Sequence, residues 1–385
     1  MTAGQSGMAR CINLAALQVL IQLLAGDGYA VIGPIRRDDA IVYDRIAGIT
    51  DLPAGWTDDQ GPGHYALVRR GDDALFGYAV GPDAWKRFLH PPVETLWRAQ
   101  REGDTFTLAA PRAPAPRYAF LGVRACDLRA IAIQDRVFCQ GAYTDRSYAD
   151  RRRNAFIVAV HCGGVGGNCF CASMGCGPRV DAGFDLALTE LVDPAPHRFL
   201  IEVGSEAGAA MLARLDSEEA TSSDLDLAES VFKRAASQMG RHINTRGLKE
   251  LLQTQPHHPR WDEVAARCMA CGNCTMACPT CFCTTIEDHG SIDESSAERV
   301  RTWDSCFTLD FSFIHGGSVR QSASSRYRQW LTHKLAHWID QFGVAGCVGC
   351  GRCITWCPVG IDLTEEVAAL RMATDPGSTV SHEHP

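Results

Sequence analysis

Hydrophobic positions near the start of the chain follow first a helical and then a strand period. Leu14 to Leu24 repeats apolar residues at helical spacing, interrupted by Gln18 and Gln22. This pattern predicts an amphipathic core helix that is too short to span a bilayer. Short apolar runs at Tyr29 to Ile35 and Ala40 to Tyr43 surround a polar turn and predict two strands. The chain therefore opens with a mixed α/β pattern.

A strand–helix–strand pattern follows in the next part of the chain. Tyr118 to Val123 and Ala155 to Val160 are apolar runs of strand length, and Leu128 to Val137 between them has helical periodicity. This order predicts a βαβ unit with a partly parallel sheet. Cys126 and Cys162 directly follow the two runs. Because functional groups in such sheets gather beyond the carboxyl ends of the strands, we expect these two cysteines to approach each other.

Two copies of one cysteine spacing carry the clearest chemistry. Both read C-x2-C-x2-C-x3-C-P, the run that binds 4Fe-4S cubanes in bacterial two-cluster ferredoxins. The first run contains Cys268, Cys271, Cys274 and Cys278, followed by Pro279. The second run contains Cys347, Cys350, Cys353 and Cys357, followed by Pro358. The sequence therefore predicts two 4Fe-4S clusters and one-electron transfer.

The fourth cysteine of such a run ligates the neighbouring cluster rather than its own. The predicted ligands of cluster 1 are Cys268, Cys271, Cys274 and Cys357. Those of cluster 2 are Cys347, Cys350, Cys353 and Cys278. Structural zinc is the alternative, because CxxC pairs also bind zinc. Zinc sites usually use two separated pairs, so two runs of four that each end in Cys-Pro fit zinc poorly.

The pattern divides the chain into four parts. Residues 1–215 are expected to form an α/β domain, and residues 216–261 an acidic linker and helix. Residues 262–372 are expected to form an α-helical dicluster ferredoxin-like domain, and residues 373–385, which are poor in apolar residues, a disordered tail. The long insert between the cysteine runs supports helices around the clusters through its apolar positions Tyr327, Trp330, Leu331, Leu335 and Trp338.

Ten of the eighteen cysteines lie outside the two runs. A glycine-rich stretch after the second strand of the βαβ unit contains several of them. Together with the first strand's cysteine they are candidates for a third iron–sulfur cluster: Cys126, Cys162, Cys169, Cys171 and Cys176. Spacing alone does not identify a cluster here, and buried free thiols are the alternative. Cys306 either packs beside the dicluster region or acts as a ligand.

Composition narrows the class of protein. The chain has 385 residues, 46% hydrophobic and 21% charged, as is ordinary for a globular protein. The net charge of −8 gives no indication of the basic surface that binds nucleic acid. So many cysteines without a secretory signal predict a reducing, cytoplasmic location rather than a disulfide framework.

Four motifs together resemble a known family. They are Gly122 to Ala130 (GVRACDLRA), Cys169 to Gly175 (CFCASMG), Cys278 to Cys283 (CPTCFC), and Arg326 to Lys334 (RYRQWLTHK) followed by the second cysteine run. The chain resembles the iron–sulfur beta subunit of cytosolic nickel–iron hydrogenases of the sulfhydrogenase type. It is also similar to the corresponding iron–sulfur subunit of anaerobic sulfite reductases. Ala125 departs from the family string, in which proline is expected.

The resemblance implies a non-catalytic electron-transfer subunit without a membrane span. A flavin subunit would exchange electrons with NAD(P)H, and a separate subunit would carry the nickel–iron or sirohaem chemistry. The hydrogenase role is preferred, with the sulfite reductase role as the alternative. Arg352, between two cluster ligands, either raises the potential of its cluster or lies at the surface against a partner or solvent.

Overall fold

An eight-stranded mixed sheet forms the core of the N-terminal half. The computed structural model describes residues 9–79, 81–109, 115–193 and 196–372. The strand order is β12-β1-β11-β10-β9-β8-β2-β3, and the four central strands from β10 to β2 are parallel. In this order the strands are β12 (Glu218–Glu219), β1 (Arg10–Asn13), β11 (Arg198–Val203), β10 (Leu186–Leu191), β9 (Phe156–Val160), β8 (Tyr118–Val123), β2 (Ala30–Arg37) and β3 (Ala40–Arg45).

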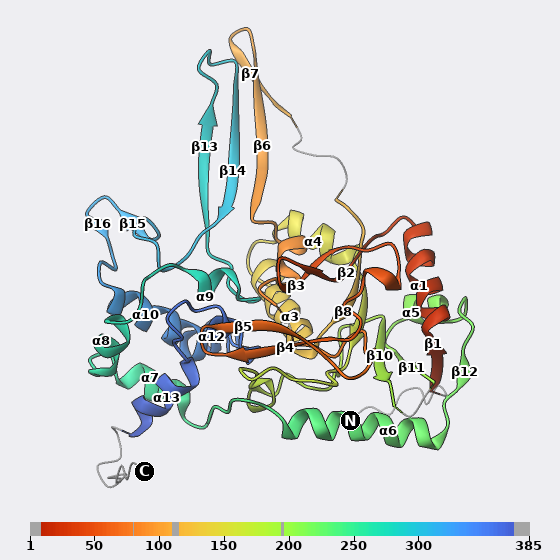
Figure 1. The fold of residues 1–385 in the computed structure, drawn as a ribbon. Coiled ribbons are helices and arrows are strands. Elements are labelled where there is room, and N and C mark those ends of the chain that lie inside the picture. The colour runs from red at the N-terminus through yellow and green to blue at the C-terminus, as the bar shows by residue number, and fades with distance from the viewer. Residues whose placement is uncertain (1–8, 80, 110–114, 194–195, 373–385) are drawn as a thin grey trace.

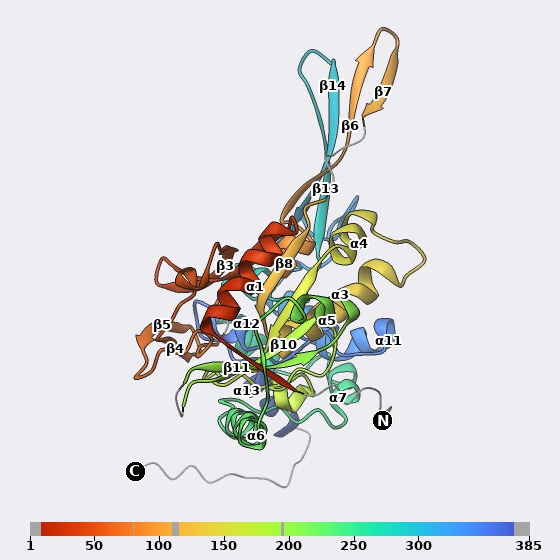
Figure 2. The same cartoon turned by 90° about the vertical axis from the view of Figure 1, so that its right-hand side faces the viewer.

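The central strands are buried on both faces because helices cover both sides of the sheet. In β9, Val158 belongs to one hydrophobic core and its neighbour Ile157 to the other. Such double burial is typical of parallel sheets. One face is covered by α1 (Leu14–Gly26) and α5 (Glu206–Leu212), and the other by α3 (Ala125–Cys139) and α4 (Arg146–Arg153) (Figures 1 and 2). The predicted α/β fold of this half is thus confirmed.

The segment predicted as an acidic linker and helix is a packed part of the structure. Helix α6 (Ser222–Ser237) sets Ala228, Val231 and Phe232 against the strands β10 and β11. The predicted helical stretch from Leu227 to Leu252 is interrupted, because α6 ends at Ser237 and α7 (Leu248–Thr254) begins eleven positions later. At the break, a Cβ on Gly240 would lie 1.9 Å from the carbonyl oxygen of Gly167, so the backbone itself contacts the glycine-rich loop.

Short helices form the C-terminal half. Around one hydrophobic core lie α7, α8 (Arg260–Ala265), α9 (Asn273–Met276), α10 (Ala323–Thr332), the π-helical segment η3 (His333–His337), α11 (Trp338–Phe342), α12 (Arg352–Thr355) and α13 (Leu363–Met372). The predicted apolar positions of the insert, among them Trp330 and Leu335, are buried in this core or the neighbouring one. The helical interpretation therefore holds for the second part of the insert.

The first part of the insert is not helical but forms half of a projecting sheet. Strands β13 (Thr284–Gly290) and β14 (Ser296–Trp303) pair with β6 (Val93–Glu102) and β7 (Thr105–Ala109) of the N-terminal half, in the order β13-β14-β6-β7. This sheet projects from the body as an arm (Figure 1). The prediction of a helical dicluster domain is therefore incomplete, and the arm joins two regions that the sequence assigns to different domains.

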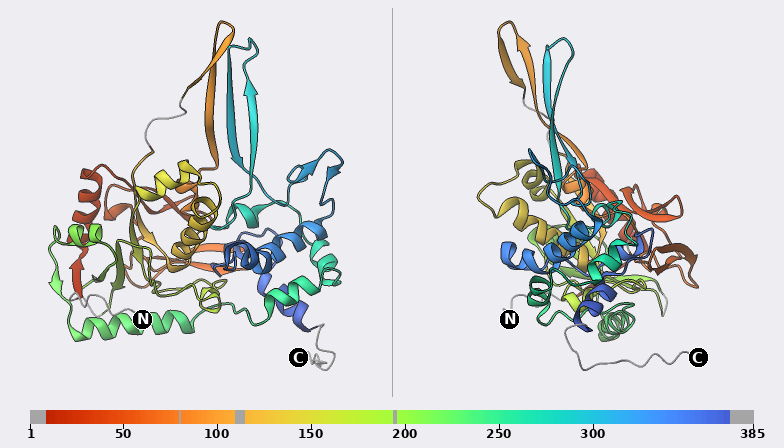
Figure 3. Two further views of the ribbon diagram at one scale, coloured as in Figure 1. Left: turned by 180° about the vertical axis from the view of Figure 1, so that it is seen from behind. Right: turned by 90° about the vertical axis from the view of Figure 1, so that its left-hand side faces the viewer.

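Smaller elements connect the two halves. The hairpin of β4 (Trp56–Gly61) and β5 (His64–Arg69) lies beside α12, and the amide of Gly63 donates to the carbonyl of Ile354 at 3.1 Å. Figure 2 and the right-hand view of Figure 3 show this hairpin at the edge of the body. The remaining elements are η1 (Ile49–Asp51), α2 (Lys86–Leu89), η2 (Cys171–Met174), β15 (Phe313–Ile314) and β16 (Gly317–Ser318).

No helix within the described ranges has the length and apolar character needed to cross a membrane. The predicted tail, residues 373–385, lies outside the described residues.

Buried ion pairs anchor the base of the arm. The carboxylate of Glu94 on β6 lies 2.7 Å from the guanidinium of Arg151 on α4 and 2.6 Å from that of Arg301 on β14. Burial acts to raise the pKa of Glu94, but Ser147 and these two arginines hold it at about 2. The carboxylate is therefore ionised at neutral pH and joins three elements from distant parts of the chain.

We expect the substitution Glu94→Gln to destabilise the protein by about 3 kcal/mol, because it leaves the buried guanidinium of Arg151 without its carboxylate, although Arg301 keeps its pair with Asp145. Thermal unfolding under anaerobic conditions measures the effect as a lower Tm. The matched control is Glu298→Gln on the same sheet, whose pair with Arg98 is exposed and should contribute less than about 1 kcal/mol. Equal unfolding temperatures for the two variants would contradict the anchoring role.

Candidate iron–sulfur site

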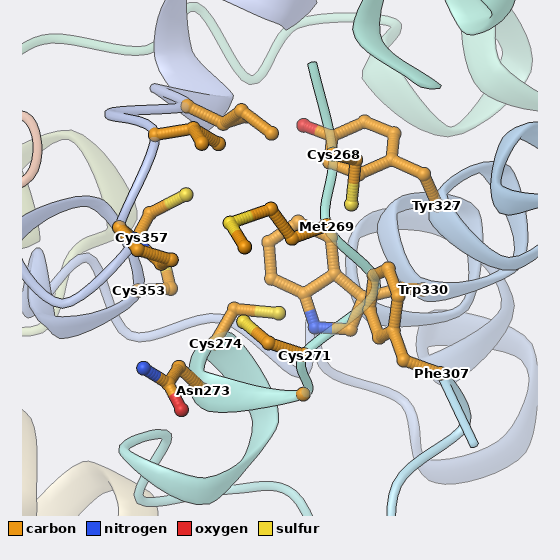
Figure 4. Close-up of a pocket in the computed structure, with 14 residues that line it drawn as sticks. Cys268, Met269, Cys271, Asn273, Cys274, Phe307, Tyr327, Trp330, Cys353 and Cys357 are labelled. Carbon is orange, nitrogen blue, oxygen red and sulfur yellow. The ribbon is translucent and has the colours of Figure 1, made fainter. Parts of the chain in front are cut away.

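The first cysteine run lines a cavity together with one cysteine from the second run. Cys268, Cys271 and Cys274 lie on one side of this cavity and Cys357 on the other (Figure 4). Phe307 and two aromatic side chains of α10, Tyr327 and Trp330, complete the wall. The cavity is therefore rich in thiols and otherwise largely apolar, an environment that suits a cluster held by thiolates.

A second cavity is lined by the complementary set. Its thiols are Cys278, Cys347, Cys350 and Cys353, and Phe170 from the N-terminal half closes it. Cys278 lines only this second cavity, and Cys357 lines only the first, so each run sends its fourth cysteine to the other cavity. Cys353 reaches both cavities and lies between them.

The two runs share one local backbone path. Gly272 has φ +78° and precedes α9, and Gly351 has φ +77° and precedes α12. Two residues earlier, Ala270 and Gly349 also have positive φ, at +52° and +69°. Left-handed residues turn the chain sharply, and glycine adopts them without steric cost. These turns let three closely spaced thiols face a common space.

Lys334 is a buried cation beside the second cavity. Its Nζ donates to the Sγ of Cys278 at 3.1 Å and to the Oγ1 of Thr280 at 3.1 Å. Burial alone would lower the pKa of Lys334, but the neighbouring sulfur groups of Cys278 and Cys281 raise it well above its usual value. The pKa of Cys278 is lowered by hydrogen bonds from Cys281 and Thr280 and by the charge of Lys334. The thiolate form that ligates iron is therefore favoured at Cys278.

A second buried lysine and three further thiols lie nearby, an arrangement that sequence patterns did not predict. Lys86 on α2 donates to the carbonyl of Cys281 at 3.1 Å and lies over the ring of Trp303. A hydrogen bond from Cys306 lowers the pKa of Cys283 to about 7. The sequence did place Cys306 beside the dicluster region or among its ligands, but it gave no signal for Lys86, which is far from these cysteines in the chain.

Arg352 is not at the surface, so the solvent and partner interpretation of this residue is wrong. Its side chain is fully buried, and Nη2 lies 2.9 Å from the Oδ1 of Asp127 on α3. Nε donates to the carbonyl of Gly81 at 3.3 Å. Because Asp127 offsets the charge of Arg352, we expect this pair to influence a cluster less than Lys334 does.

The predicted third group of cysteines gathers next to the second cavity. Cys126 and Cys171 pack in one core with Val348, and Cys350 lies against that core. Cys162 and Cys169 lie close enough to Cys171 to raise its pKa further after burial has raised it. Cys171 is therefore the common neighbour of Cys126, Cys162 and Cys169, while the approach of Cys126 and Cys162 to each other stays a prediction.

Residues 267–361 match the family described as "4Fe-4S dicluster domain". The chain contains a two-cluster iron–sulfur domain. The matched residues include all eight cysteines of the two runs, and the thiol-lined cavities fit two 4Fe-4S clusters. Within the described part of the chain, no three His, Cys, Asp or Glu side chains form a group that could hold a single metal ion.

A comparison along the whole chain gives a relative. The chain is 28% identical over 341 residues to Sulfhydrogenase 2 subunit beta of Pyrococcus furiosus, covering 86% of this chain and 89% of that protein. This similarity confirms the resemblance to iron–sulfur beta subunits of the sulfhydrogenase type. It favours this family over the corresponding subunit of anaerobic sulfite reductases. No solved structure matches the chain.

We expect Lys334→Met to lower the reduction potential of the cluster in the second cavity on the order of 100 mV, because it removes a buried positive charge and an N–H···S bond. Potentiometric titration followed by electron paramagnetic resonance measures both clusters. Lys249→Met, which removes a lysine of α7 that pairs with Asp340, is the control and should change neither potential. Unchanged potentials in Lys334→Met would refute this tuning role.

Proposed function

We propose that the chain is the electron-transfer subunit of a soluble nickel–iron hydrogenase. It would relay single electrons through two 4Fe-4S clusters, between a flavin subunit that uses NAD(P)H and a catalytic subunit that turns over hydrogen. The observation that carries the proposal is the exchange of fourth cysteines between two adjacent cavities. Two cubanes that share their ligand runs lie side by side, which makes them a conduit rather than two isolated sites.

The cavities support the ligand sets expected from the spacing. Cluster 1 is assigned to Cys268, Cys271, Cys274 and Cys357. Cluster 2 is assigned to Cys347, Cys350, Cys353 and Cys278. When bound, a cubane accepts or gives up one electron, and the surrounding side chains set the potential at which it does so. In this assignment Lys334 acts on cluster 2 through its bond to Cys278.

The exposure of the residues around the two cavities supports an order for the two clusters in the relay. Cys271 is exposed, and the neighbouring Met269 has 67% of its surface accessible. Val359, next to the second run, is also exposed. By contrast Cys278 and Cys347 are buried. Cluster 1 would therefore present an apolar edge to a partner subunit, and cluster 2 would lie deeper in the chain.

Anaerobic isolation with its co-purifying subunits should yield nickel and flavin, and hydrogen gas should reduce the clusters of this chain. Metal analysis and the electron paramagnetic resonance spectrum under hydrogen measure the two results. A complex with a sirohaem absorption band and no nickel would replace the hydrogenase proposal with the sulfite reductase role. A chain that binds its clusters but never exchanges electrons with a partner would refute both.

The crossed ligand assignment has its own test. Cys357→Ser should impair cluster 1, although Cys357 belongs to the second run, and the remaining cluster should still respond to Lys334→Met. Cys278→Ser should impair cluster 2, and the remaining cluster should not respond to Lys334→Met. Potentiometric titration of the single and double variants gives the readout. Cys139→Ser, outside both runs, is the control. If Cys357→Ser instead removed the same cluster signal as Cys350→Ser, each run would hold its own cluster.

A further inference from the structure

Four thiols of the N-terminal half gather around Cys171, which lies next to the second cavity. Cys126 is the second residue of α3, which follows β8, and Cys162 follows the parallel neighbour β9. The loop after β9 then returns over this edge of the sheet with Cys169 and Cys171. The structure therefore combines the ends of two strands with one loop, although these residues are up to 45 positions apart in the sequence.

The loop that carries Cys171 is in direct backbone contact with the second cysteine run. The amide of Phe170 donates to the carbonyl of Gly349 at 2.8 Å. A Cβ on Gly349 would lie 2.6 Å from the Cα of Cys171, and one on Gly351 would lie 2.4 Å from the carbonyl oxygen of Asn168. Glycine at both positions permits this approach. The loop that carries Cys169 and Cys171 is therefore an immediate neighbour of the second cavity.

A buried cation lies beside these thiols without a carboxylate partner. Arg124 is 2% exposed, donates to the carbonyls of Phe76, Tyr78 and His161, and leaves its Nε without an acceptor among the described residues. No ion pair joins Arg124 to an acidic side chain in the described ranges. Burial raises the pKa of Cys162, and the contact with Arg124 offsets part of that rise. A buried charge is costly unless something opposite in sign offsets it.

Cys176 packs in the same core as Cys126 and Cys171, but it differs from the other four thiols in its hydrogen bond and its charged neighbours. Its Sγ donates to the carbonyl of Met174 at 3.2 Å, and the residue lines a surface pocket with Arg129 and Arg179. Burial raises the pKa of Cys176 to about 11, and its charged neighbours are Arg129 and Asp181 rather than Arg124. Cys176 therefore provides a matched control within the same loop.

We propose that Cys126, Cys162, Cys169 and Cys171 bind a third 4Fe-4S cluster, with Arg124 as its buried counter-charge. Four thiolates on an oxidised cubane core of charge 2+ carry a net charge of 2−, which a guanidinium group offsets in part. The inference rests on the proposed relay, in which the enclosed cluster 2 needs a further acceptor or donor. The third cluster would exchange one electron at a time with cluster 2.

The test is the iron and acid-labile sulfide content of the complex purified under strictly anaerobic conditions, with Mössbauer and electron paramagnetic resonance spectra. We expect about twelve irons per chain, four for each cubane. Cys171→Ser and Cys162→Ser should each reduce this to about eight and keep the signals of clusters 1 and 2. Cys176→Ser should keep about twelve. The retained signals of the two other clusters show that a variant has folded.

Several outcomes would overturn the proposal and leave the relay intact. About eight irons in the unsubstituted chain, with two intact clusters, would show that the four thiols are free. Loss of the additional iron in Cys283→Ser but not in Cys171→Ser would move the third cluster to the thiols around Lys86. Equal loss in Cys176→Ser and Cys171→Ser would refute the ligand set. Failure of the proposed relay is distinguished by the absence of the cluster 1 and cluster 2 signals themselves.

Discussion

The close approach of two backbone segments is the constraint on which the centre of the molecule depends. The loop at Asn168 to Cys171 and the second cysteine run meet at Gly349 and Gly351 with no room for a side chain between them. Asn168 adds bonds to Thr355 and to the carbonyl of Gly61. This contact closes the second cavity with Phe170 and brings the cysteines of the α/β half next to those of the helical half. A larger residue at either glycine would separate the two halves where their thiols meet.

The interior of this protein contains several positively charged side chains, although its net charge is negative. The chain has a net charge of −8, yet Lys86, Arg124, Lys334 and Arg352 are all buried around the cysteines. Of these four, only Arg352 forms an ion pair with a carboxylate among the described residues, to Asp127. Buried charges require compensation. The thiolates that hold iron supply negative charge at this place, so the interior is electrostatically consistent only when the cysteines are ionised and ligated.

Much of the fold could be predicted from local sequence patterns. The helix from Leu14, the βαβ unit and the helical part of the insert follow from residue periodicity, and the eight cluster cysteines follow from a fixed spacing. The arm could not be predicted, because β14 pairs with a strand about 200 positions earlier, with Ser296 opposite Gln100. The break between α6 and α7 was missed for a similar reason, since Gly240 is determined by a contact with Gly167. Buried cations such as Lys86 resemble ordinary surface residues in sequence, and only the fold places them beside sulfur.

The arm has a consequence for how the chain is made. Strands β6 and β7 are synthesised early, but β14 pairs with β6 only after some 200 further residues have followed. Until then the nascent chain presents β6 as an open edge, and such edges invite pairing with other chains. The N-terminal half therefore cannot cover this strand edge by itself while the chain is still on the ribosome. Its maturation must wait for the cysteine-rich half, so chaperone protection during translation would matter more for this protein than its ordinary composition indicates.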